Sequence, residues 1–166
     1  MEQSVGQAAH RRYARLVALA CGALYLAFIV AGFGLLSLWS NTEVIATQGL
    51  GLLDGPIMAA VSVLTLTALL FVRAPRAVGV GLDWGYAVLV ALLAGLSYLL
   101  AGFVVGLVDV GVGAGVDVVL HALSSGYAVL ATASAVLVAL LYSWVISRRY
   151  DERGRPRWMW EDEFDA

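Results

Sequence analysis

Asp54, Asp117 and His121 are the side chains of this 166-residue sequence whose types and spacing could support chemistry. Each lies near the edge of a long apolar segment. Ionisable groups in such segments are costly to bury and are therefore candidates for function. If helices brought the three to one end of a bundle, their carboxylates and imidazole would form a vestibule for cations.

Asp117 and His121 are four residues apart, which places them on the same face of a helix. The carboxylate would then orient the imidazole ring. Ser124 or Ser125 follows one turn later. The alternative interpretation is structural: a capping Asp and an interfacial His that tolerate the headgroup region.

Asp54 precedes Gly55 and Pro56, a pattern typical of a helix start. A carboxylate there complements the positive end of the helix dipole. The functional alternative is a cation or proton site, with Ser62 and Thr65 continuing a polar stripe along the same helix.

Several other chemistries are excluded. The single Cys21 excludes an intrachain disulfide and redox chemistry based on paired thiols, and there is no Cys/His spacing of a zinc site. A haem would need paired histidines deep in the bundle. His121 and Ser124 on one helix supply neither an oxyanion hole nor a third orienting residue. We expect no catalytic residue, no metal and no cofactor.

The elements that must position these residues are membrane helices. The chain is 61% hydrophobic and 13% charged, against about 25% charged residues in soluble domains. A span needs about 20 mostly apolar residues. Four segments meet this length, so we predict an all-α polytopic membrane protein with spans at 16–39, 52–72, 86–108 and 118–147. Residues 1–15 and 148–166 would be an amino-terminal flank and a tail.

The ten basic residues are all arginine and alternate between the soluble segments. They are absent from the loops 40–51 and 109–117, and the positive-inside rule therefore places both termini in the cytoplasm of a bacterial plasma membrane. Basic residues at membrane boundaries do not form a nucleic-acid surface. The arginines lie at positions 11, 12, 15, 73, 76, 148, 149, 153, 155 and 157.

An internal repeat is indicated by a shift of 73 residues, which aligns Tyr13–Leu19 with Tyr86–Leu92 and continues through Gly22/Gly95 and Tyr25/Tyr98. A shift of 71 aligns Gly55 with Gly126. Chance similarity is the alternative, because Ala and Leu recur often in membrane helices. A true repeat would be a duplicated two-helix hairpin whose halves run in the same direction.

Small residues allow close contact between membrane helices. Ala91, Gly95, Gly102 and Gly106 share one helical face, and the last two form a GxxxG pattern. This face is predicted to pack against another helix, either of the same chain or of a second copy.

The tail after Ser147 is first basic, then aromatic, then acidic. Trp158, Trp160 and Phe164 could dock on a partner or enter the membrane interface, or the tail could simply anchor topology. Its Arg-Pro-Arg-Trp-x-Trp-Glu-Asp sequence and the four-span layout resemble a family of small uncharacterised integral membrane proteins of high-GC Gram-positive bacteria. That resemblance implies no activity.

The sequence therefore predicts a small accessory, assembly or scaffold subunit that acts through helix packing and its tail. Its expected partners are the lipid bilayer and either another membrane protein or further copies of itself, with no nucleic acid. The alternative function is a small transporter or channel component with Asp54, Asp117 and His121 at an external vestibule.

Overall fold

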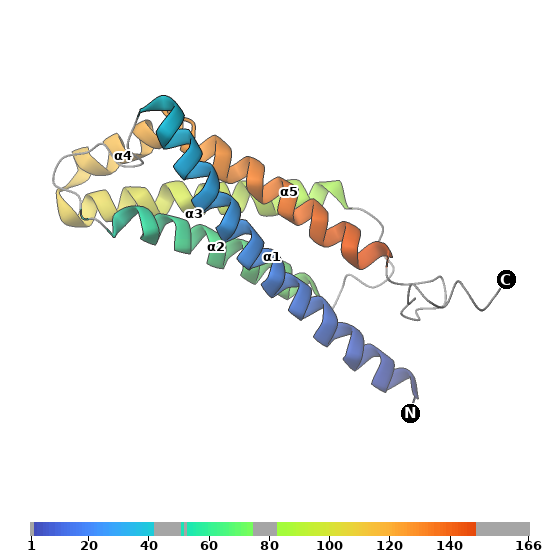
Figure 1. The fold of residues 1–166 in the computed structure, drawn as a ribbon. Helices are drawn as coiled ribbons and strands as arrows, with labels where there is room; N and C mark the ends of the chain where they lie inside the picture. Colours follow the sequence, from blue (N-terminus) through green and yellow to red (C-terminus); the bar gives the residue numbers. More distant parts are fainter. Residues whose placement is uncertain (1, 42–50, 52, 75–82, 149–166) are drawn as a thin grey trace.

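The computed structural model describes residues 2–41, 51, 53–74 and 83–148, and within these residues the chain is helical apart from short turns (Figure 1). The five helices are α1 (Glu2–Ser40), α2 (Asp54–Arg73), α3 (Trp84–Asp109), α4 (Val112–Ser124) and α5 (Tyr127–Arg148). Four stretches are long and apolar enough to span a membrane: Arg11–Ser40, Asp54–Arg73, Trp84–Asp109 and Tyr127–Ser147. The predicted all-α class is confirmed.

Helix α1 is longer than a bilayer requires. Its 39 residues extend about 58 Å at 1.5 Å per residue, against about 30 Å of hydrocarbon. Figure 1 shows its amino-terminal end projecting beyond the other helices. The predicted flank 1–15 is thus not a separate segment, because α1 continues through it from Glu2. The helix ends where Asn41 takes a left-handed conformation with φ of 51°.

The fourth predicted span, 118–147, is wrong as a single helix. Gly126 has φ of +87°, a conformation that interrupts a helix and that glycine adopts without steric cost. The chain therefore divides into α4 and α5 at Ser125–Gly126. Kinks at Gly/Ser pairs are common in helices.

The predicted glycine loop 109–117 is also mostly helical. Helix α3 continues to Asp109, and α4 already begins at Val112, so the connection is reduced to Val110 and Gly111. Gly111 turns the chain with φ of +132°, and α4 then packs back against α3.

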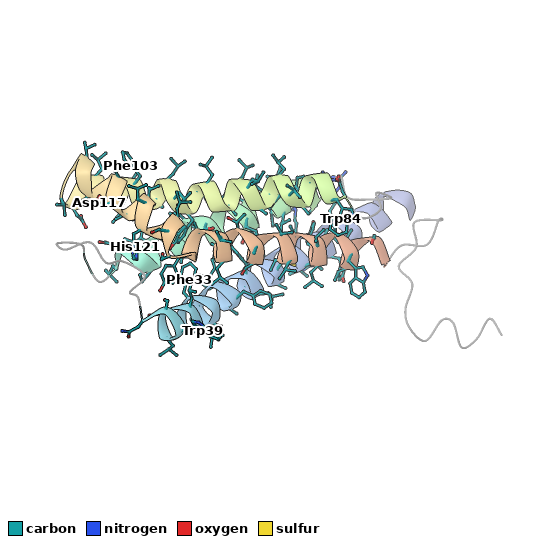
Figure 2. All side chains as sticks on the ribbon, turned by 90° about the horizontal axis from the view of Figure 1, so that it is seen from above. Phe33, Trp39, Trp84, Phe103, Asp117 and His121 are labelled. Atoms are coloured by element: carbon teal, nitrogen blue, oxygen red, sulfur yellow. The ribbon has the colours of Figure 1, made fainter. Side chains whose placement is uncertain are left out.

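The four spans form a bundle in which α1 and α3 occupy opposite corners. Helix α1 packs against α2 and α5, whereas α3 packs against α2, α5 and α4. The described ends of α1 and α5 that carry arginines lie at the same end of the bundle (Figure 1). Figure 2 shows Trp84 near this end and Trp39, Asp117 and His121 at the opposite end.

Aromatic residues divide between the core and the membrane-facing surface. Trp39, Trp84 and Trp144 are exposed, as expected for rings that favour the headgroup region. Among the described tyrosines, Tyr13 and Tyr86 are partly buried. Four others are fully buried and form the largest side chains of the core: Tyr25, Tyr98, Tyr127 and Tyr142.

The proposed repeat matches the packing of α1 and α3 but not that of the helices after them. Gly22 of α1 lies against Thr67 of α2, and Gly95 of α3 lies against Thr132 of α5. In contrast, Gly55 lies within α2 whereas Gly126 interrupts the chain before α5. The 71-residue alignment therefore pairs residues with different structural roles.

Candidate functional site

A buried hydrogen-bond network connects all four spanning helices. The Tyr25 hydroxyl of α1 lies 2.9 Å from Ser62 Oγ of α2 and 3.2 Å from the carbonyl oxygen of Ala131 in α5, and can donate to either. Ser62 in turn donates to the carbonyl oxygen of Ala94 in α3 at 2.8 Å. Both side chains are fully buried. The network thus fixes the relative positions of the four helices from inside the bundle.

Sequence reasoning had noted both residues without joining them. Tyr25 was a marker of the repeat, and Ser62 was part of a polar stripe below Asp54. The structure divides that stripe: Ser62 enters the core, whereas Thr65 is only partly buried and donates back to the Val61 carbonyl of its own helix. The burial of Ser62 could have been inferred from its position, because it lies on the same helical face as the apolar residues Met58 and Leu66. Both are buried with it.

Asp54 is the first residue of α2, and it makes two hydrogen bonds with the backbone of Gly51, three residues earlier. Its carboxylate is buried and accepts a hydrogen bond of 2.6 Å from the Gly51 backbone N–H, and its own N–H bonds to the Gly51 carbonyl at 3.3 Å. The bond closes the turn before α2 but is not an amino-terminal cap, because the cap position is Leu53 and no side chain there caps the helix. The carboxylate still lies in the first turn, where it complements the positive end of the helix dipole. Pro56 follows in the first turn, where its missing N–H costs no helical bond.

Asp117 and His121 both lie on α4 at the same end of the bundle as Trp39 (Figure 2). Asp117 is exposed, whereas His121 is partly buried with its ring centroid 6.4 Å from that of Tyr127. Among the described residues, no three His, Cys, Asp or Glu side chains are grouped as metal ligands. Asp54 begins α2, whereas Asp117 and His121 lie on α4, and the external vestibule stays a prediction.

The glycine face of α3 meets other helices of the same chain. A Cβ at Gly106 would lie 2.7 Å from the Gly115 Cα of α4, and a Cβ at Gly102 would lie 2.5 Å from the Met58 Cε of α2. Gly95 faces Thr132 of α5, and Ala91 is fully buried. The predicted packing face is therefore used within the chain, and Gly115, expected in a loop, is part of it.

A second polar cluster joins α2 to α3 at the arginine-bearing end. Arg73 pairs with Asp83, and its guanidinium carbon lies 3.9 Å from the Tyr86 ring centroid. The Tyr86 hydroxyl donates to the Leu69 carbonyl at 2.6 Å. Arg73 thus contacts both the residue before α3 and the first turn of that helix. From the sequence alone, Arg73 indicates only the orientation of the chain.

Asp83 is also the amino-terminal cap of α3. Its carboxylate accepts a hydrogen bond of 3.0 Å from the Tyr86 backbone N–H. This bond is the main cause that holds the pKa of Asp83 below its usual range, and the neighbouring Arg73 lowers it further. A further contact of this kind joins α1 to α2, where the Arg15 guanidinium carbon lies 5.0 Å from the Phe71 ring centroid.

The proposed tail motif, Trp158, Trp160 and Phe164, lies outside the described residues. The match to a family model nevertheless includes this part of the sequence, since it extends over residues 7–166. Neither the curated proteins nor the solved structures contained a match to the chain. The matched model is described as a family of unknown function, DUF6121, and because the match covers nearly the whole chain, the chain belongs to this family.

Proposed function

We propose that this chain is an accessory, assembly or scaffold subunit of a bacterial plasma membrane, with a self-contained bundle as its anchor. The network of Tyr25 and Ser62 is the observation that carries this proposal. Its hydrogen bonds to Ala94 and Ala131 connect four helices through the core. Because its four helices are connected through the core, the bundle can hold a fixed shape while partners bind at its surface.

The distribution of charge supports a subunit that binds its partners at one end of the bundle. The arginine-bearing end carries the Arg73–Asp83–Tyr86 cluster, which fixes the start of α3 against the end of α2. By the positive-inside rule this end faces the cytoplasm. The aromatic and acidic residues of the tail would then be presented to cytoplasmic or membrane-bound partners.

Affinity purification tests this function. A protein tagged at the carboxyl terminus is extracted in mild detergent, and a stoichiometric partner is expected to co-purify. The double substitution Trp158→Ala/Trp160→Ala should lose that partner, because large aromatic residues carry much of the binding energy in interfaces. Trp144→Ala is the matched control, since Trp144 is exposed on the surface of α5 and should leave the partner bound. Recovery of the wild-type protein alone would contradict the proposal.

A transporter or channel component is the competing function. It would require Asp54 to be available to a cation, but the carboxylate accepts a hydrogen bond from the Gly51 N–H. Substitution of Asp54 separates the two functions, and its expected result is given in the Discussion.

A further inference from the structure

Three arginines lie close together on α1, at the end of the bundle that carries the basic residues. Arg11, Arg12 and Arg15 are all exposed. At 3.6 residues per turn they fall within an arc of about 100° on the helix surface. None of the three forms an ion pair within the described part of the chain. Their positive charges are therefore concentrated on one side of α1.

This side of α1 faces α2. Gly22 lies within the same arc and packs against Thr67 of α2. The Arg15 guanidinium carbon lies 5.0 Å from the centroid of the Phe71 ring, and Phe71 is itself 37% exposed. The three arginines thus lie along the junction between α1 and α2, where a cation–π contact holds Arg15 at the surface.

Arginines at this spacing repel each other. Arg11 and Arg15 are four residues apart and are therefore neighbours on the helix surface, where like charges are destabilising. Arg73 also lies over a ring, that of Tyr86, but it has the Asp83 carboxylate as its counter-charge. Arg15 has the same kind of contact without a carboxylate. This difference favours an anion from outside the chain as the counter-charge of the α1 arginines.

The depth of Arg15 in the membrane indicates which anion. Trp39 is exposed at the opposite end of the bundle (Figure 2), where a tryptophan ring favours the headgroup region. Arg15 lies about 36 Å from Trp39 along the axis of α1, at 1.5 Å per residue. Because the hydrocarbon layer is about 30 Å thick, Arg15 reaches the headgroups of the other leaflet. The anions at that depth are lipid phosphates, which guanidinium groups bind through paired hydrogen bonds.

We propose that Arg11, Arg12 and Arg15, with the Phe71 ring, form a binding site for the phosphate of an anionic phospholipid at the junction of α1 and α2. An anionic lipid is favoured over a zwitterionic one, because its headgroup carries no cation that the arginines would repel. Basic sites between membrane helices on the cytoplasmic side are typical of such recognition. The proposed orientation decides only the leaflet in which the lipid lies, and the site needs no protein partner.

Lipid titration of the full chain in mild detergent, followed by native mass spectrometry, tests the site. Phosphatidylglycerol should bind at least about tenfold more tightly than phosphatidylcholine. Arg11→Gln/Arg15→Gln should weaken phosphatidylglycerol binding at least about tenfold, the loss expected for one hydrogen bond to a charged group. Arg148→Gln is the control, because it removes a charge at the end of α5 and should leave the affinity close to that of the wild type. Equal affinities for the two lipids, or displacement of phosphatidylglycerol by inorganic phosphate, would overturn the proposal.

Phe71→Leu distinguishes a defined site from general surface charge, because it keeps every arginine and removes only the ring beside Arg15. The affinity for phosphatidylglycerol should fall about threefold, since Arg15 loses the contact that holds it at the junction. An unchanged affinity would mean diffuse attraction, and the site would be wrong. Binding that appears only after removal of residues 161–166 would assign the arginines to the acidic end of the tail, and would equally contradict a lipid site.

Discussion

At the scale of single residues, the Ser62 hydroxyl is central because it links Tyr25 to Ala94. Ser62→Ala is expected to destabilise the protein by about 1 kcal/mol, the order measured for hydrogen bonds between membrane helices. Chemical or thermal unfolding in detergent measures the change. Thr65→Ala is the control, because Thr65 donates only to its own helix. An equal loss of stability in both variants would contradict a special role for the network.

Asp54 is expected to stabilise the turn before α2 through the Gly51 N–H, and not to bind a cation. Asp54→Asn keeps a side-chain oxygen that can accept the Gly51 N–H, so its unfolding temperature should remain close to that of the wild type. Asp54→Ala should cost about 1 kcal/mol, the order of one hydrogen bond, because it leaves the Gly51 N–H without this acceptor. Cation-dependent flux in liposomes should be the same for Asp54→Asn and for wild type. A flux lost in Asp54→Asn would instead favour the transporter.

The lowered pKa of Asp83 predicts a contribution to stability that depends on pH. An aspartate whose pKa is lower when folded stabilises the protein above its unfolded pKa of about 3.9. This stabilisation is lost as the pH falls through the lower, folded value. Thermal unfolding followed between about pH 5 and pH 2 should show this loss in the wild type and less of it in Asp83→Asn. Parallel profiles would show that the Tyr86 N–H and Arg73 do not act on Asp83 in this way.

At the scale of helices, the crossing of α3 and α4 depends on two glycines. Gly106→Ala would place a methyl group 2.7 Å from the Gly115 Cα, and overpacking of this kind costs about 1–3 kcal/mol. Gly113→Ala is the matched control on α4, where an added Cβ would meet nothing within 4 Å. It should be neutral or slightly stabilising, because alanine favours helix. Equal unfolding temperatures for both variants would contradict the close crossing.

The same helices show how far the sequence could predict the fold. Four apolar segments of bilayer length could be predicted, because the preference for the membrane depends on the hydropathy of about 20 consecutive residues, which is read directly from the sequence. The break at Ser125–Gly126 was not evident, since a glycine within an apolar segment is compatible with a continuous membrane helix. Gly126 is distinguished by its positive φ, and the helix before it, α4, packs against α3. Neither feature can be read from the local sequence.

For the candidate site, sequence reasoning found residues but not their partners. The pattern Asp54-Gly55-Pro56 predicts a helix start, but not that the cap position is Leu53 or that the Asp54 carboxylate accepts from the Gly51 N–H. Tyr25 and Ser62 are 37 residues apart in sequence and meet only because α1 packs against α2. A hydroxyl in an apolar helix gives no indication of its direction until the neighbouring helices are placed.

At the scale of the whole molecule, four helices are long and apolar enough to cross a membrane, and the proposed function places the arginine-bearing end of the bundle in the cytoplasm. Asn41 and Arg12 suit a test because both are exposed and lie at opposite ends of α1. Cys21 is buried and is the only cysteine, so Cys21→Ala gives a background without thiols. The proposed partner depends on this orientation, since the tail must face the compartment in which the partner is found.

The most direct measurement is labelling of intact cells with a membrane-impermeant maleimide. In the Cys21→Ala background, Asn41→Cys should be labelled from outside. Arg12→Cys should be labelled only after the membrane is permeabilised. The reverse pattern, or labelling of both positions in intact cells, would contradict the four-span arrangement with a cytoplasmic arginine-bearing end.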